Sequence, residues 1–260
     1  MRILYLTTRT VHHAYVLERL EDAGHEVVTV SEDGIDFSST GVFKARVRRF
    51  TRKPSIRAFV KYAPFVRVPL FDRIQSSAEG RMLEVKRSTS ARLHLRNINE
   101  LVREALLEED WDLVLVFGTR QLGRELVAAL WERAIPMVNV HCAILPYIRG
   151  LESHWWSLVR RQWHEIGVTI HFVEQRLDTG DIVGQSTTDL NNVAHPWQLR
   201  GVATREVAPI IIANEDRLLN HKRERFVENR WETDGRYYSF PGLLVQLGGA
   251  LSFYLRKLGL

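Results

Sequence analysis

The strongest constraint on the fold is an alternation of short apolar runs with amphipathic stretches that begins near the N-terminus. Residues 3–7 have the length and composition of a buried strand, and residues 11–23 place their apolar side chains on one side of a helix. Gly24 follows as a helix stop, and residues 26–30 form a second apolar run. A strand, helix and strand at this spacing predict a βαβ unit with parallel strands and a right-handed crossover.

The same alternation resumes in the second half of the chain. It predicts a helix over residues 93–107, whereas the pattern between residues 33 and 92 is irregular and is interrupted by Pro54, Pro64 and Pro69. The further strands are expected over residues 112–117, 137–141, 168–173 and 182–185, and the further helices over residues 123–131 and 196–220. The sequence therefore predicts an α/β fold, a Rossmann-like and mostly parallel twisted sheet with helices on both faces.

Positive charge is concentrated in one region. The chain has a formal net charge of +5, but between Lys44 and Arg103 there are 16 Lys and Arg against 4 Asp and Glu. Such a region is typical of a partner that carries phosphates, such as a nucleic acid, a nucleotide-linked substrate or an anionic lipid surface. The alternative is a solvated face of Arg-rich helices. Apolar residues are interleaved throughout, which favours a folded segment over a basic tail.

Other features exclude several classes of protein. With Cys142 as the only cysteine, neither an internal disulfide nor a thiolate zinc site can form, and this predicts a cytoplasmic protein. No apolar run approaches the ~18 residues of a membrane-spanning helix, and the start of the chain does not read as a secretory leader. The turn after the first strand lacks a Gly-rich pattern, and the chain contains neither a P-loop nor an H-E-x-x-H motif.

Polar residues with catalytic chemistry gather between residues 139 and 181. Asn139 and His141 are two apart at the end of an apolar run, so they project from the same face of a strand. The carboxyl ends of parallel strands are where open α/β sheets bind ligands, and a Leu-Asp-Thr-Gly turn can carry Asp178 over that edge. An amide, an imidazole and a carboxylate can together stabilise an oxyanion and move protons during acyl transfer. Taken singly, each residue also has a purely structural interpretation, as a cap, a half-buried histidine or a turn residue.

Four elements in fixed order resemble the signature of the folate-dependent formyltransferase family. They are N-x-H at residues 139–141, L-P-x-x-x-G at 145–150, G-x-T-x-H at 167–171 and L-D-T-G at 177–180. The resemblance covers about residues 111–185, is fainter over 1–30, and is absent over 33–92 and after 220. It implies a formyltransferase catalytic domain over residues 1–220, with a basic insertion over about 33–92, and a C-terminal extension over 221–260.

The resemblance also implies the roles of individual residues. A substrate amine would attack the formyl carbon of 10-formyltetrahydrofolate, Asn139 and protonated His141 would stabilise the oxyanion, and Asp178 would orient His141 and relay the proton. No metal is implied. Many family members have Pro-Ser where this chain has Cys142-Ala143, which changes the substrate contacts expected of that loop. The implied folate pocket is lined by Gly118, Thr119, Arg120, Gln121, Leu122, Val127, Met137, Val173 and Gln175.

The amine acceptor is reached by eliminating branches of the family. Forty residues follow residue 220, too few for the tRNA-binding barrel of methionyl-tRNA formyltransferases, and no separate domain precedes the first strand as in the deformylases. The first turn also lacks the Gly-rich phosphate loop of glycinamide ribonucleotide enzymes. We therefore expect a nucleotide-linked amino sugar, whose diphosphate the basic insertion would face. The alternatives are the glycinamide ribonucleotide or methionyl-tRNA type, or a non-catalytic relative that binds folate or nucleic acid, although no nucleic-acid-binding motif accompanies the basic region.

The C-terminal tail is strongly apolar. Residues 240–255 carry no charge and are followed by Arg256 and Lys257. A helix of this length reaches about 24 Å, short of the ~30 Å hydrocarbon core of a bilayer, and Gly242, Gly248 and Gly249 are expected to weaken it. The tail can dock on its own chain, on a second subunit in a homodimer, or peripherally on a membrane.

Overall fold

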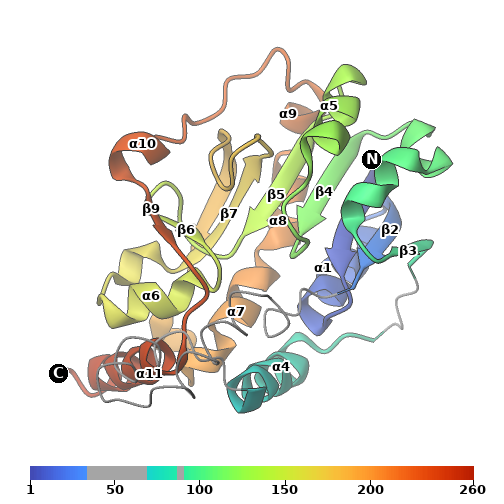
Figure 1. Cartoon of the computed structure of the whole chain (residues 1–260). Helices are drawn as coiled ribbons and strands as arrows, with labels where there is room; N and C mark the ends of the chain where they lie inside the picture. Colours follow the sequence, from blue (N-terminus) through green and yellow to red (C-terminus); the bar gives the residue numbers. More distant parts are fainter. Residues whose placement is uncertain (34–68, 87–90) are drawn as a thin grey trace, which may run out of the picture.

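A seven-stranded sheet forms the centre of the molecule in the computed structural model, which describes residues 1–33, 69–86 and 91–260 (Figure 1). The strand order is β3-β2-β1-β4-β5-β7-β8. All pairs from β3 to β5 are parallel, whereas β7 runs antiparallel to both β5 and β8. This arrangement confirms the expected mostly parallel α/β sheet. The strands are β1 (Arg2–Thr8), β2 (Glu26–Glu32), β3 (Leu93–Leu95), β4 (Leu113–Phe117), β5 (Met137–His141), β7 (Gly167–Phe172) and β8 (Ile182–Thr187).

Helices cover both faces of the sheet, because successive side chains of a central strand point to opposite sides. Ile3 and Tyr5 of β1 pack into a core with α1, α7 and α8, whereas Leu4 and Leu6 pack into a second core with α5. The helices are α1 (Val11–Asp22), α4 (Pro69–Leu83), α5 (Arg124–Glu132), α6 (Ser153–Val159), α7 (Leu199–Arg205), α8 (Val207–Ala213), α9 (Glu215–Leu219), α10 (Trp231–Asp234) and α11 (Leu243–Lys257). Among the described residues, no helix has both the length and the apolar character needed to cross a membrane.

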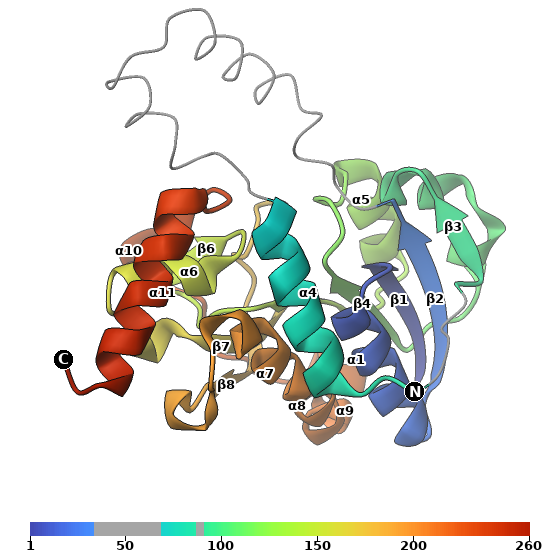
Figure 2. The ribbon, with the colours of Figure 1, turned by 90° about the horizontal axis from the view of Figure 1, so that it is seen from below.

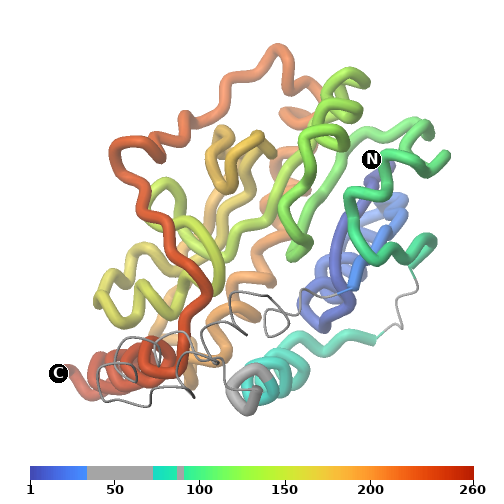
Figure 3. The backbone as a smooth tube through the Cα atoms, in the orientation of Figure 1, coloured from blue at the N-terminus to red at the C-terminus, as the bar shows by residue number. Residues whose placement is uncertain are grey.

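The C-terminal part of the chain returns to the middle of the fold. After α9 it runs along one edge of the molecule to α10 and then past α6 to α11 (Figures 1 and 3). On this path β9 (Arg236–Tyr238) pairs in parallel with the short strand β6 (Ile148–Gly150) and forms a second, two-stranded sheet. The extension therefore lies directly against the loop that follows β5.

The segment after residue 92 differs from the expected single helix. Residues 93–95 form β3 at the edge of the sheet, followed by two 3₁₀ turns, η2 (Ile98–Arg103) and η3 (Ala105–Glu108). The side chain of Asn97 accepts a hydrogen bond from the N–H of Asn99 and starts η2, while the extended backbone of Glu104 separates the two turns. The prediction of a helix over residues 93–107 is wrong because capping and the sheet edge override the apolar periodicity.

Two expectations about helix breakers also need correction. Pro69 begins α4, since a proline at the first helical position gives up no intrahelical hydrogen bond. Helix α11 is continuous through Gly248 and Gly249, where a Cβ atom on Gly249 would lie 3.0 Å from the Trp155 ring, so the glycine permits close packing on α6. Residues 196–220 are helical, as expected, but are divided into η6 (Pro196–Gln198), α7, α8 and α9. Most of the basic insertion, residues 34–68 and 87–90, lies outside the described residues.

Candidate active site

His141 is the last residue of β5 and is buried. Its Nε2 lies 2.9 Å from the carbonyl oxygen of Ile148. A carbonyl oxygen can only accept, so Nε2 carries the proton and donates, which leaves the Nδ1 lone pair facing Asp178 Oδ1 at 3.6 Å. Burial lowers the pKa of His141, an effect that the charge of Asp178 partly offsets. The resting site therefore favours a neutral imidazole at this position.

Asp178 lies in the turn between β7 and β8 and is almost fully buried. Its Oδ2 accepts a hydrogen bond from the Gly150 N–H at 3.0 Å, and its Oδ1 faces the imidazoles of both His141 and His171 at 3.6 Å. Burial alone would raise the pKa of Asp178, but the positive charge of the two imidazoles when they are protonated, together with the Gly150 N–H, holds that pKa well below its usual range. The carboxylate is therefore ionised at neutral pH.

Asn139 is joined to this cluster through His171, which the sequence reasoning did not list as a site residue. His171 lies opposite Asn139 in the β5–β7 pairing, and its Nδ1 donates to the carbonyl oxygen of Phe172 at 2.8 Å. Its Nε2 can then accept from the Asn139 Nδ2 at 3.1 Å. One amide hydrogen of Asn139 is thus engaged and the other is left for a ligand. The G-x-T-x-H motif contained the signal for His171.

The short strand β6 connects the catalytic pair. Its first residue, Ile148, accepts from His141, and its last residue, Gly150, donates to Asp178. The φ of Gly150 is +106°, and a Cβ atom there would lie 1.9 Å from the carbonyl oxygen of Tyr238 in β9, so only glycine fits between the two strands. The last residue of the L-P-x-x-x-G motif therefore allows β9 to hold β6 close to His141 and Asp178.

Five of the expected folate residues line one cavity together with Asn139 and Asp178, whereas the buried His141 is not part of that lining. Thr119, Arg120, Gln121 and Leu122, in the turn after β4, form one wall, and Asn139, His171, Val173 and Asp178 belong to the same lining. Of the remaining expected residues, Val127 and Met137 are buried in the apolar core behind the wall, although Val127 also borders a neighbouring hollow. Gln175 lines a neighbouring hollow, and its carbonyl oxygen accepts a hydrogen bond from Gln121 Nε2 at 3.2 Å.

The turn after β4 is fixed by a carboxylate that the sequence reasoning did not identify. The buried Glu32, at the end of β2, accepts from the Arg120 N–H at 2.6 Å and from the Arg120 Nε at 2.5 Å. It also accepts from the Ile98 N–H at 2.9 Å. Gly118, which begins the turn with a φ of +75°, leaves space for the His13 ring, because a Cβ atom there would lie 2.4 Å from that ring. Glu32 and Gly118 therefore set the shape of the predicted folate wall.

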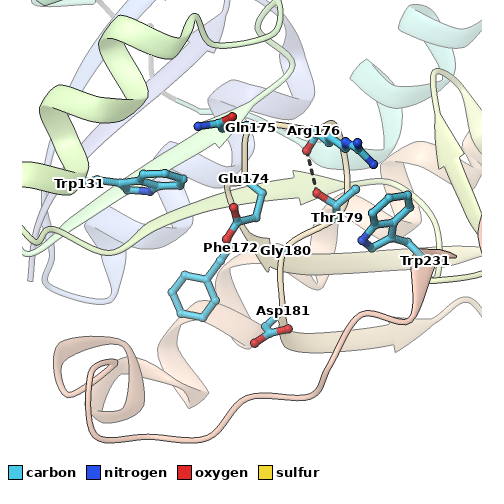
Figure 4. A pocket seen from close by; sticks show the side chains of 9 residues that line it. All are labelled: Trp131, Phe172, Glu174, Gln175, Arg176, Thr179, Gly180, Asp181 and Trp231. Carbon is cyan, nitrogen blue, oxygen red and sulfur yellow. Dashed lines mark hydrogen bonds between the residues drawn. The ribbon is translucent and has the colours of Figure 1, made fainter.

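A wider pocket of about 500 Å³ opens beside this cavity and shares Glu174 and Arg176 with it (Figure 4). Trp131 at the end of α5 and Trp231 in α10 lie on opposite sides of it, with Phe172 and Asp181 between them. Arg149 and Arg176 lie over the Trp231 ring at 4.8 and 5.3 Å. Burial, together with Asp181, raises the pKa of Glu174. The pocket thus offers aromatic walls and charges of both signs next to the catalytic turn.

On the other side of the catalytic loop lies a buried ionic cluster of Arg200, Glu79 and Glu152. Arg200 donates to Glu79 through Nε at 2.6 Å and Nη2 at 2.9 Å, and to Glu152 through Nη1 at 2.5 Å. Burial would raise the pKa of Glu79, but Arg200 outweighs it and lowers that pKa to about 2. Glu152 follows Gly150 by two residues, so the cluster ties α4 and α7 to the loop that contains β6.

Two other possibilities for chemistry find no support in the geometry. Burial raises the pKa of the Cys142 thiol to about 12, so it stays protonated and is not an activated nucleophile. Within residues 1–33, 69–86 and 91–260, no three His, Cys, Asp or Glu side chains are grouped so as to hold a metal ion.

The family relationship rests on both sequence and structure. Residues 70–197 match the family model described as formyl transferase. Over this stretch, just under half of the chain, the protein is similar to the formyl transferase family. A methionyl-tRNA formyltransferase of Finegoldia magna is 36% identical over 98 residues, which make up 37% of this chain and 31% of the relative. A dTDP-4-amino-4,6-dideoxyglucose formyltransferase of Mycobacterium bovis is 39% identical over 83 residues, 32% of this chain and 33% of the relative. The chain thus aligns with about a third of the length of these curated relatives.

Solved structures have the same fold over nearly the whole of this chain. A 4-N formyltransferase from Francisella tularensis aligns with 97% of this chain and 87% of its own, with a TM-score of 0.56 and 14% identity. HypX from Aquifex aeolicus, solved in complex with tetrahydrofolic acid, aligns with 97% of this chain and 34% of its own, with a TM-score of 0.50 and 12% identity. At these identities the structures support the formyltransferase fold.

Proposed function

We propose that the protein transfers the formyl group of 10-formyltetrahydrofolate to a primary amine of a small molecule. One observation carries this proposal: Asn139 and Asp178, which are 39 residues apart in sequence, line one cavity whose other wall is the turn after β4, and the buried His141 lies 3.6 Å from Asp178 Oδ1. The match of residues 70–197 to the formyl transferase family model supports the reaction, and the tetrahydrofolate complex of the structurally similar HypX supports the donor.

The arrangement suits attack of an amine on a formyl carbon. The amine nitrogen forms a bond to this carbon, the carbonyl oxygen becomes an oxyanion, and the bond to N10 of the folate then breaks. Asn139 can donate its second amide hydrogen to the oxyanion, because the first is engaged by His171. The amine must lose one proton and N10 must gain one, and the Asp178–His141 pair can carry it.

A neutral His141 imidazole is able to accept the proton that the amine loses. Its Nδ1 lone pair faces the ionised Asp178 carboxylate, so a proton taken from the amine is shared between these two groups. The imidazolium formed in this way adds positive charge beside the oxyanion and then returns the proton to N10. Ile148 keeps the ring in place throughout by accepting from Nε2.

The folate donor fits the cavity between the turn after β4 and the loop at 173–178. The turn presents backbone groups and the side chains of Thr119 and Gln121, and Val127 and Met137 provide an apolar backing. Such a mixture suits a flat heterocycle that carries both donors and acceptors at its edge. The aromatic pocket between Trp131 and Trp231 is open to the remainder of the donor or to the acceptor (Figure 4).

For the acceptor we propose a nucleotide-linked amino sugar. The match to a dTDP-4-amino-4,6-dideoxyglucose formyltransferase supports this choice, and the match to a methionyl-tRNA formyltransferase supports its competitor over a similar length. Both relatives act on a primary amine, so the catalytic cluster alone does not discriminate between them. The Gly-poor first turn and the basic sequence between Lys44 and Arg103 favour an acceptor with a diphosphate.

The deciding experiment is a screen of acceptors with the full chain. Purified protein and 10-formyltetrahydrofolate are incubated with dTDP- and UDP-linked 4-amino sugars, glycinamide ribonucleotide or methionyl-tRNA, and products are identified by mass. We expect a formamide only with a sugar nucleotide, and none with the His141→Ala variant. Formylation of methionyl-tRNA alone would overturn the choice of acceptor, and no formyl transfer to any amine would overturn the reaction.

A further inference from the structure

Helix α11 has two faces of different character. Val245, Ala250 and Phe253 are buried in an apolar cluster with Trp155 and Leu158 of α6. On the opposite face Leu244, Leu247, Leu251 and Leu258 are 43%, 48%, 62% and 73% exposed among the described residues. Their spacing of three, four and seven residues makes one continuous stripe, called here the leucine ridge. The first face anchors the helix to the fold, and the second face takes no part in that packing.

The charges around the leucine ridge have one sign. Residues 235–260 contain no Asp or Glu, and their charged residues are Arg236, Arg256 and Lys257. Arg256 and Lys257 are exposed in the last turn of α11, immediately before Leu258. Arg256 lies over the Trp163 ring at 5.2 Å, and Lys257 Nζ donates to the carbonyl oxygen of Asn191 at 2.9 Å. The ridge thus ends in two cations held at the protein surface.

A second run of positive charge precedes α4 in the sequence. Residues 34–68, outside the described part, contain nine Lys and Arg and one Asp, interleaved with aromatic and aliphatic residues. This segment reaches the described chain at Pro69, the first residue of α4. Helices α4 and α11 both pack against η6, and both views place them along the same side of the molecule (Figures 1 and 2).

We propose that the leucine ridge docks on the surface of an anionic lipid bilayer. Amphipathic helices that lie in the membrane interface combine an apolar face with nearby Lys and Arg, which is the pattern found here. An anionic surface compensates the charge of Arg256 and Lys257 at the end of the ridge. A second copy of this chain would instead bring a face of the same sign to the contact. This proposal is independent of formyl transfer.

The test is sedimentation of the full chain with vesicles at low salt. One set of vesicles is phosphatidylcholine, and the other is phosphatidylcholine mixed with phosphatidylglycerol. We expect binding to the mixed vesicles that weakens with salt, and little binding to the neutral ones. The double variant Leu247→Glu, Leu251→Glu should lower the partition coefficient at least tenfold. The double variant Arg256→Gln, Lys257→Gln should lower the same coefficient about fivefold for each cation that the parent protein brings to the lipid surface. Ile212→Glu with Leu219→Glu, at residues 40% and 46% exposed on α8 and α9, is the matched control and should bind like the parent protein.

Thermal melting and sedimentation velocity complete the test. Unchanged melting of the Leu247→Glu, Leu251→Glu variant and a monomeric parent protein support a ridge that is free to meet lipid. Absence of binding to the mixed vesicles overturns the proposal. The proposal is also overturned if the ridge variant binds as well as the control, or if the parent protein is a dimer that the ridge substitutions dissociate. A loss of melting temperature typical of a core substitution would overturn it as well, because it would show that the chain itself covers the ridge.

Discussion

Asn229 holds the backbone of the turn that carries Asp178. Its Nδ2 donates to the carbonyl oxygens of Asp178 and Gly180, both at 3.1 Å, and its side chain is buried. Asp178 has a φ of +55°, a left-handed conformation that is unfavourable for a residue with a Cβ atom. The two hydrogen bonds from Asn229 stabilise this conformation, which aims the carboxylate at His141. A residue from the C-terminal extension therefore positions the Asp178 carboxylate.

Asn229→Ala should reduce turnover without preventing folding. Losing two hydrogen bonds to buried carbonyl groups is expected to cost about 1–3 kcal/mol of stability, and the freed turn should place Asp178 less precisely. We expect kcat to fall at least about tenfold, since catalytic geometry is sensitive to displacements of ~1 Å, with little change in KM for the folate. Steady-state kinetics and urea unfolding measure the two effects.

The control for Asn229 is Trp156→Phe. Trp156 Nε1 donates to the carbonyl oxygen of Ser239 at 2.9 Å, so it ties the same C-terminal segment to the fold without touching the Asp178 turn. If both variants lose stability and turnover in parallel, Asn229 has a general structural role and does not position Asp178.

The catalytic group itself makes a second prediction. Asn139→Ala, His141→Ala and Asp178→Ala should each fold and lose most formyl transfer. Removing a single oxyanion donor typically costs about 10²–10³ in kcat, and we expect at least this for Asn139, whose free amide hydrogen is assigned to the oxyanion. Circular dichroism establishes the fold, and product mass at saturating folate establishes turnover. Wild-type turnover of His141→Ala would contradict the proposed mechanism.

The features that could be predicted from sequence are those that neighbouring residues encode. The buried strands are mostly apolar runs, so all six expected strands agree with the structure to within about two residues. Asn139 and His141 share a strand face, and the L-D-T-G turn follows the next strand, so their meeting with Asp178 followed from topology. Residues 93–107 were not predictable in this way, because their apolar spacing resembles that of a helix while Asn97 and the edge of β2 impose another structure.

The parts that sequence reasoning missed depend on distant partners. Glu32 is 88 residues from Arg120, and Asn229 is 51 residues from Asp178. Nothing near Asn229 in the sequence marks it as part of the site. Its partners are backbone carbonyl groups, which every residue has, so they produce no recognisable pattern of side chains. The continuity of α11 through Gly248 and Gly249 likewise depends on packing against α6, and the helix propensities of single residues carry no information about such packing.

The imidazole of His141 provides a test of the electrostatics. Burial lowers its pKa and Asp178 raises it, so the titration midpoint should lie below the ordinary value of about 6.5. In Asp178→Asn the opposing charge is absent, and the midpoint should fall further. The measurement is a ¹⁵N-NMR pH titration of the ring nitrogens, assigned with His141→Gln. A midpoint that stays the same or rises in Asp178→Asn would show that the two groups do not interact.

Asp178 also links the site to acid stability. Because its pKa is lower in the folded than in the unfolded chain, its contribution to stability is present above about pH 4, the unfolded value, and is lost as the pH falls toward the folded pKa. Asp178→Asn should therefore flatten the pH dependence of the free energy of unfolding below pH ~4. Urea unfolding across that range measures the slope, and identical slopes in the two proteins would exclude the linkage.

The Arg200 cluster makes the last prediction, because Arg200 is the cation that both Glu79 and Glu152 contact. In Arg200→Met the buried Glu79 and the partly buried Glu152 lose that cation, and breaking a buried pair in this way typically costs about 3–5 kcal/mol. The loss should be largest at neutral pH and smaller in acid, where the carboxylates take up protons. Since Glu152 follows Gly150 by two residues, kcat should fall as well. Arg160→Met is the matched control, because Arg160 pairs with the buried Glu165 at the far end of α6 at 3.1 Å, and its contact near the site is with the Tyr238 ring at 5.5 Å rather than with Glu152. Urea unfolding at neutral and acid pH, together with kcat, separates the two variants, and an equal loss of kcat in Arg160→Met would mean that the cluster supports only the fold.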